Sequence, residues 1–154
     1  MMEGQQPQKR RNGHQTHSEA IAAVKFELDR RGYEVSQCAR NSIPRADLKV
    51  ISPINRKDFL VAVTGLYKRN PWKLKLKPPG ADPGLFRVLA FVPEDGPKQF
   101  FVMTETQAQH LIRADHTRLN RTDRYPAPWI TWRKEEQGEP GLRLHLSAWD
   151  IPPK

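Results

Sequence analysis

A run of basic side chains between Lys68 and Lys77 is the stretch of this sequence best suited to chemistry. These ten residues hold five cations and no acid, Trp72 lies among them, and Tyr67 directly precedes them. Closely spaced cations neutralise phosphates, and interleaved aromatic rings stack on bases, so the pattern predicts nucleic-acid binding with Trp72 as a stacking residue. The five cations are Lys68, Arg69, Lys73, Lys75 and Lys77.

The same segment has a second interpretation that involves no ligand. The letters WKLKLK alternate apolar and basic residues, so Trp72, Leu74 and Leu76 could pack inward while the lysines protect an exposed strand edge from aggregation. The two interpretations make different demands on Trp72, and both stay open at this point.

The overall charge agrees with a polyanionic partner. Lys and Arg number 26 and Asp and Glu number 17, so the net charge is 26 − 17 = +9. Such an excess favours nucleic acid as the partner but does not itself distinguish DNA from RNA. Of the two, we expect DNA. A strongly charged domain without such a partner has the same composition.

Composition also bounds the class of protein. A chain of 154 residues with 37% apolar residues can bury the core of one domain, and its 14 prolines predict long irregular connections. The only cysteine, Cys38, cannot form an internal disulfide, and no Cys/His cluster has zinc spacing.

No apolar run is long enough for a membrane span, so we expect a cytoplasmic protein without a membrane partner; a homodimer stays open. His110, His116 and His145 are dispersed and match no catalytic or metal-binding pattern.

Several elements are needed to position these residues. We expect residues 1–15 to be a disordered basic tail and residues 16–154 to be one domain. A capping box of Thr16 and Glu19 predicts the start of a first helix, and a second box of Thr104 and Gln107 predicts another. Strands are predicted at 33–39, 46–52, 58–65, 85–92 and 98–103, an irregular excursion at 66–84, and a terminal hairpin of 129–132 with 142–149.

The first part of this order resembles a known family. A helix carrying Glu19, then GYEV at 32–35, IPRADLKV at 43–50 and FLVAVTG at 59–65 are similar to the PD-(D/E)xK nuclease-like superfamily, particularly its small resolvase-like bacterial members. The resemblance covers about residues 16–114. It implies a single α/β domain in which helices flank a mixed central sheet, with an αβββαβ restriction-endonuclease-like core and a C-terminal β-hairpin extension.

The resemblance also implies a site. In that family, acids on adjacent strands bind Mg²⁺ and a lysine activates water beside the phosphate. Carried over, Asp47 matches the first acid and Glu19 matches the helix acid of some members, as catalytic residues and metal ligands. The second acid and the lysine fall on Ala62 and Thr64, which have neither group. Lys49, two residues after Asp47, or Lys68 could replace that lysine.

Three functions therefore remain open. The first is a nucleic-acid-binding protein of nuclease-like fold that is weakly active or inactive as a nuclease, and that needs no cofactor. The second is an active Mg²⁺-dependent endonuclease using Asp47, Glu19 and a relocated lysine. The third is a protein-interaction module that does not bind nucleic acid.

Overall fold

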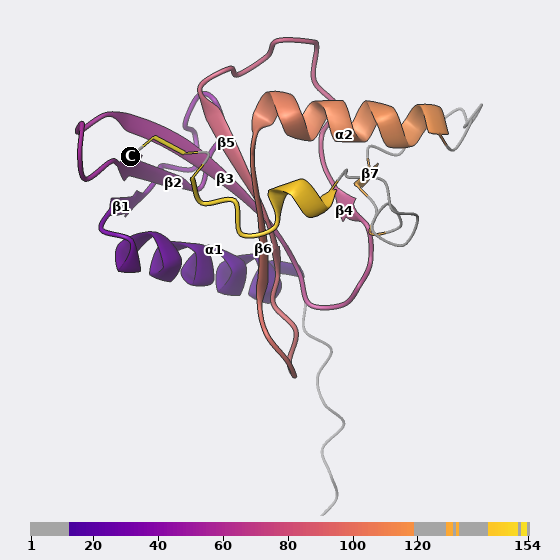
Figure 1. The fold of residues 1–154 in the computed structure, drawn as a ribbon, viewed down its shortest axis with the longest axis horizontal. Helices are drawn as coiled ribbons and strands as arrows, with labels where there is room; N and C mark the ends of the chain where they lie inside the picture. The colour runs from indigo at the N-terminus through magenta and orange to yellow at the C-terminus, as the bar shows by residue number, and fades with distance from the viewer. Residues whose placement is uncertain (1–12, 119–128, 131, 133–141, 151, 154) are drawn as a thin grey trace, which may run out of the picture.

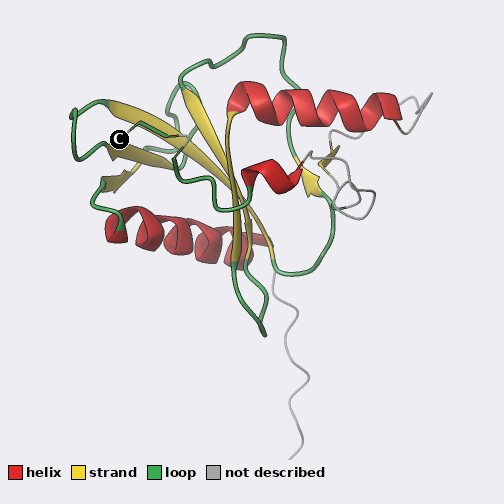
Figure 2. Cartoon of the chain, in the orientation of Figure 1, coloured by secondary structure: helices red, strands yellow, loops and turns green. Residues whose placement is uncertain are grey.

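The computed structural model describes residues 13–118, 129–130, 132, 142–150 and 152–153, and of residues 115–118 and 129 the main chain only. Two helices and a five-stranded mixed sheet dominate this part of the chain (Figures 1 and 2). The elements are α1 (Gly13–Arg30), β1 (Glu34–Gln37), β2 (Leu48–Ile51), β3 (Asp58–Leu66), β4 (Trp72–Lys73), β5 (Leu85–Phe91), β6 (Gln99–Thr104), α2 (Glu105–Arg118), β7 (Trp129–Ile130) and the 3-10 helix η1 (Leu142–His145).

The sheet has the order β1-β2-β3-β5-β6. The pairs β1–β2, β2–β3 and β5–β6 are antiparallel, while β3 and β5 are parallel with Ala62 opposite Arg87. The predicted α/β domain with a mixed central sheet is therefore confirmed. The connection from β3 to β5 contains only the short strand β4 and no helix, and α2 follows β6 instead. That order differs from the αβββαβ core that the resemblance implied.

Helix α1 covers one face of the sheet. Ala20 is fully buried and Thr16 nearly so, and both lie against Gly65 of β3, where an added Cβ would come within 2.5 Å of the Ala20 Cβ. This close approach explains why glycine stands at the end of the strand. Because α1 begins at Gly13, Thr16 lies inside the helix, so the predicted capping box of Thr16 and Glu19 is wrong. Residues 13–15 of the expected tail are helical, and residues 1–12 lie outside the described part.

Helix α2 covers the opposite face (Figure 1). The predicted capping box at its start is confirmed: Thr104 N donates to Gln107 Oε1 at 2.9 Å, and Gln107 N donates to Thr104 Oγ1 at 3.1 Å. Leu111 and Ile112 of the helix are buried in one apolar cluster with Leu89 and Phe101 of the sheet. Each face of the sheet therefore has its own apolar core, which one of the two helices covers.

The C-terminal segment does not form the predicted hairpin. Residues 142–145 form the 3-10 helix η1, and Ile130 of β7 pairs with Trp72 of β4. Ser147 N donates to Phe100 O at 2.7 Å, and Leu146 bridges Phe101, so this segment lies along the outer edge of β6. An edge strand needs such cover because its main-chain groups are otherwise unpaired.

Candidate functional site

Asp47 lies directly before β2 and holds three elements together. Its Oδ2 accepts the Val63 N–H at 2.7 Å, and its Oδ1 lies 3.1 Å from His17 Nε2 on α1. The Asp47 side chain is 23% exposed, so solvent reaches it only in part. Both oxygens are engaged with the protein. The carboxylate continues the pairing with β3 ahead of the first residue of β2, which is a structural role.

Glu19 is turned away from this carboxylate. It follows His17 by two positions, which is about 200° around the helix. Glu19 instead lines a groove of about 670 Å³ between α1 and the β5–β6 hairpin, together with Phe26, Lys98 and Phe100. The structure therefore does not bring Glu19 and Asp47 to one metal position.

The two positions expected to carry an acid and a lysine are occupied in other ways. Ala62 is 4% exposed and packs in a small apolar cluster with Ala46 and Leu85. The Thr64 hydroxyl accepts a hydrogen bond from Arg87 Nη1 at 3.2 Å. Within the described ranges, no three His, Cys, Asp or Glu side chains gather closely enough to hold a metal ion.

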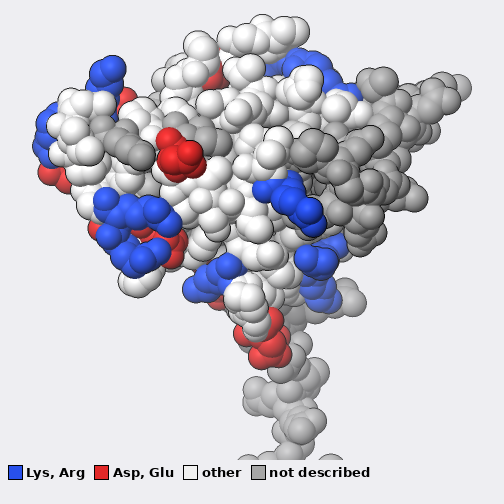
Figure 3. Space-filling view, in the orientation of Figure 1, with Lys and Arg blue, Asp and Glu red and all other residues white. Residues whose placement is uncertain are grey.

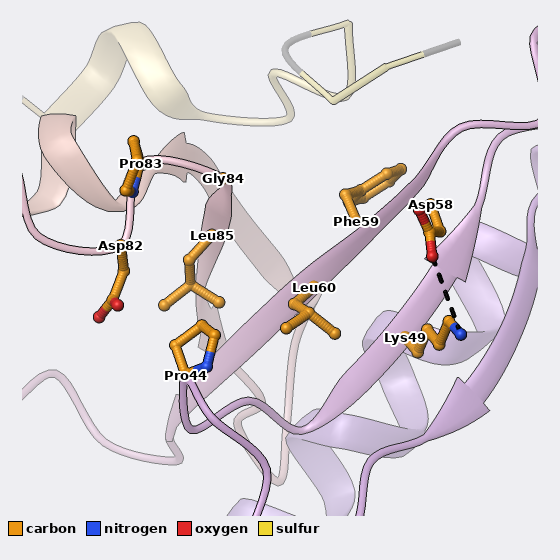
Figure 4. A pocket seen from close by; sticks show the side chains of 9 residues that line it. All are labelled: Pro44, Lys49, Asp58, Phe59, Leu60, Asp82, Pro83, Gly84 and Leu85. Atoms are coloured by element: carbon orange, nitrogen blue, oxygen red, sulfur yellow. Dashed lines mark ion pairs between the residues drawn. The ribbon is translucent and has the colours of Figure 1, made fainter.

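Lys49, the proposed replacement for the missing lysine, has a different partner. Its Nζ lies 3.8 Å from Asp58 Oδ2, and both side chains are more than half exposed. The pair stands at one side of a groove of about 560 Å³ whose lining includes Leu60, Leu85 and Pro44 (Figure 4). Lys49 thus faces this groove and Asp58, while Asp47 faces His17.

A buried ion network that the sequence analysis missed lies beneath α2. The Glu105 carboxylate has no exposed surface, and its Oε2 accepts from Arg87 Nη2 at 2.8 Å and Arg87 Nε at 3.1 Å. Lys77 Nζ lies 3.7 Å from the same oxygen and 2.8 Å from Asp82 Oδ2. The network thus contains two cations, Arg87 and Lys77, and two anions, Glu105 and Asp82, so its formal charges cancel. The signal in the sequence was Arg87 within the apolar run LFRVLAFV, since a cation there requires a buried counter-charge.

Helix α2 also binds the main chain of the excursion, which covers residues 67–84 because β3 includes Leu66. Gln109 Nε2 donates to Lys75 O at 2.9 Å, and Lys77 N donates to Gln109 Oε1 at 2.9 Å. Arg113 Nη2 donates to Lys77 O. The excursion is therefore attached to α2 over residues 75–77, although these residues belong to no strand.

The side chains of the basic segment divide into two groups. Trp72 is fully buried, with its ring centroid 4.4 Å from that of Trp132, so it has no exposed face on which a base could stack; we correct that expectation. Lys77 is 18% exposed and takes part in the ion network. The remaining cations of the segment are exposed: Lys68, Arg69, Lys73 and Lys75.

The alternation expected for an edge segment is partly confirmed. Trp72 and Leu74 are buried, whereas Leu76 is 47% exposed. The Arg69 guanidinium lies 4.6 Å from the centroid of the Trp132 ring, so an aromatic face in this region contacts one of the cations. Figure 3 shows basic side chains on one face of the molecule as separate groups, with acids beside several of them. On that face, positive charge is not gathered into one continuous patch.

Cys38 is not activated as a nucleophile. Burial raises the pKa of its thiol, and the nearby Asp47 carboxylate raises it further, while Lys49 lowers it. A reactive cysteine needs the opposite environment, in which a cation or a helix N-terminus favours the thiolate.

Comparison with protein-family models, with curated proteins and with solved structures finds no match. The described helices include none that combines the length and the apolar character needed to cross a membrane. The class defined by the fold is a mixed α/β domain with a helix on each face of its sheet.

Proposed function

We propose that this protein binds nucleic acid, DNA in preference to RNA, through phosphate contacts and without cleaving it. The observation that carries the proposal is the main chain of residues 75–77, which is hydrogen-bonded to α2 and includes the exposed Lys75, two positions after the exposed Lys73. Cations on a fixed support can neutralise phosphates with little loss of main-chain freedom on binding. The net charge of +9 acts in the same direction by attracting a polyanion.

Burial of Trp72 changes the kind of contact that we propose. A stacking platform would give single strands an advantage of about 1–3 kcal/mol per base. Trp72 has no exposed surface, so the proposed contacts are ionic and independent of base identity. Phosphate contacts fix position on a nucleic acid without reading its sequence.

The residues present do not fit the magnesium site implied by the resemblance to PD-(D/E)xK nucleases. Asp47 contacts Val63 and His17, Glu19 points to another groove, and Ala62 has no ligand atom. Catalysis by such a site depends on oriented charges, each of which contributes about 3–4 kcal/mol. We therefore propose that the protein binds nucleic acid and lacks the groups for cleavage.

The salt dependence of binding tests this proposal. Replacing Lys68, Lys73 and Lys75 by glutamine removes three cations of the segment. The plot of log affinity against log salt concentration has a negative slope, and its magnitude should decrease by about three for duplex DNA. The measurement is binding of a fluorescent duplex at several salt concentrations. The matched control replaces Lys49, Lys57 and Lys98, three exposed lysines outside the segment, and should leave most of the slope intact.

Two results would contradict the proposal. An unchanged slope in the folded triple variant removes the segment from the binding surface. Cleavage of the same duplex in Mg²⁺ or Mn²⁺, lost in Asp47→Ala, would establish the active-nuclease alternative instead.

A further inference from the structure

Residues 75–77 belong to no strand, and side chains of α2 hold their main chain. Within the 67–84 excursion only Trp72 and Lys73 form a strand, and they pair with β7. Beyond them, Lys75 O and Lys77 N find their partners in one side chain, that of Gln109. The Gln109 amide accepts and donates as a neighbouring strand would.

The orientation of this amide is itself fixed. Gln109 is 4% exposed, and its Nε2 donates at 3.1 Å to Oε1 of Glu105, one turn earlier in α2. The other oxygen of Glu105 binds Arg87, so the buried ion network holds the carboxylate that orients Gln109. A carboxylate can only accept here, which places the amide nitrogen toward Glu105 and Lys75 O, and the amide oxygen toward Lys77 N.

The exposed side chain of Lys75 depends on this attachment for its direction, whereas Lys73 is held by the pairing of β4 with β7. Lys73 and Lys75 are exposed. Trp72, which precedes Lys73, and Leu74, which lies between the two lysines, are buried. In an extended chain, side chains two positions apart point the same way and are about 6–7 Å apart. Loss of the attachment at Lys75 and Lys77 would release this alignment without removing any charge.

We infer that Gln109 is a positioning residue of the proposed nucleic-acid interface, because its amide orders the main chain at Lys75, two positions after Lys73 of β4, before a ligand arrives. The inference rests on the proposed function. It assigns a share of the binding affinity to an uncharged, buried side chain on another element. When only a fraction of molecules is ordered, the apparent dissociation constant rises in inverse proportion to that fraction.

The test compares two substitutions of the same type in the same helix. Gln109→Met keeps the size and unbranched shape of the side chain and removes both main-chain hydrogen bonds. Gln107→Met removes the hydrogen bond from Thr104 N to Gln107 Oε1, which is one of the two bonds of the capping box, and changes no group that contacts residues 75–77, so it is the matched control. Gln109→Asn, which keeps the amide but shortens its reach by one methylene, replaces the first variant if that variant does not fold.

Two measurements on the full chain are needed. Amide hydrogen exchange should speed up at Lys77 in Gln109→Met and stay as in wild type in Gln107→Met. The dissociation constant for a fluorescent duplex should rise about five- to tenfold in Gln109→Met only, with an unchanged salt slope, because the number of cations is the same.

The outcomes separate the two proposals. Faster exchange at Lys77 with wild-type affinity would overturn the positioning role and leave the proposed function standing. An equal loss of affinity in Gln107→Met would also overturn it, since general weakening of α2 would then be the cause. Wild-type protein that does not bind duplex would overturn the proposed function, and the inference with it.

Discussion

Glu105 connects the buried interior to the exposed basic segment. Its carboxylate has no exposed surface and lies between the cations of Arg87 and Lys77, while its second oxygen orients Gln109. A buried ion pair often contributes little net stability, because desolvation of the charges offsets their attraction. Its effect on structure is to fix one arrangement of the groups around it. We therefore attribute to Glu105 the position of the excursion relative to α2.

Removal of this charge should be costly. In Glu105→Gln, Arg87 stays buried at 13% exposure without a counter-ion, and the free energy of unfolding should fall by about 3–5 kcal/mol. Urea denaturation followed by far-UV circular dichroism measures this fall. Asp58→Asn is the control, because its ion pair with Lys49 is exposed and is expected to contribute about 0–1 kcal/mol. Similar small losses in both variants would contradict the assigned role of Glu105.

Residue type alone was a poor guide to the role of several of these side chains. Asp47 was expected to bind metal and Trp72 to bind bases, yet the first binds Val63 and His17 and the second is in a core. Both outcomes depend on contacts between residues far apart in the chain. Arg87 was overlooked although its apolar surroundings are visible in the sequence. A charged residue inside an apolar strand is a signal for a buried partner.

At the scale of the elements, the 3-10 helix η1 contains a buried histidine, His145. Leu142 and His145 are buried against the sheet, while Leu144 is 68% exposed. The Nδ1 of His145 is buried and has no hydrogen-bond partner among the described residues. Burial lowers the pKa of the His145 ring, and a hydrogen bond to the main chain of Val102 opposes this effect in part. Protonation of His145 therefore favours the unfolded state.

The sign of this effect predicts how stability depends on pH. Because the pKa of His145 in the folded protein lies below its ordinary value of 6.5, its contribution is fully present above about pH 6.5 and is lost as the pH falls through the lower folded value. Denaturation midpoints at pH 7.5 and pH 5 should therefore differ more for wild type than for His145→Phe. His110→Phe, at an exposed position on α2, should behave as wild type. Equal pH dependence in wild type and His145→Phe would contradict this account.

Elements with strong local signals were predicted well. The capping box of Thr104 and Gln107, the apolar run of β3 and the irregular excursion after it are all present. Residues 142–149 were predicted as one strand of a terminal hairpin, but residues 142–145 form η1, and the segment joins β6 through the Leu146–Phe101 bridge and the hydrogen bond of Ser147 N to Phe100 O. Alternation does not reveal whether a partner strand is available. The start of α1 was missed because a capping motif can also occur inside a helix.

At the scale of the whole molecule, the two cores lie on opposite faces of one sheet. The core under α1 includes Val61, Val63 and Trp149, and the core under α2 includes Trp72 and Phe101. The Trp149 ring lies 5.6 Å from Phe100 on β6, and the Arg31 guanidinium lies 5.4 Å from it. The C-terminal segment therefore closes the core under α1, and the shared sheet should couple this core to the other.

This coupling predicts a single unfolding transition. Trp149→Ala removes a large side chain that is 6% exposed, so the free energy of unfolding should fall by about 3–5 kcal/mol. In this variant the remaining tryptophans are Trp72, Trp129 and Trp132, so fluorescence reports on the region of the second core. If the sheet couples the cores, fluorescence and far-UV circular dichroism should shift to the same lower urea midpoint. Leu144→Ala, an exposed change in the same segment, should leave both midpoints unchanged. A fluorescence midpoint that stays at the wild-type value while the circular dichroism midpoint falls would show that the two faces of the sheet unfold separately.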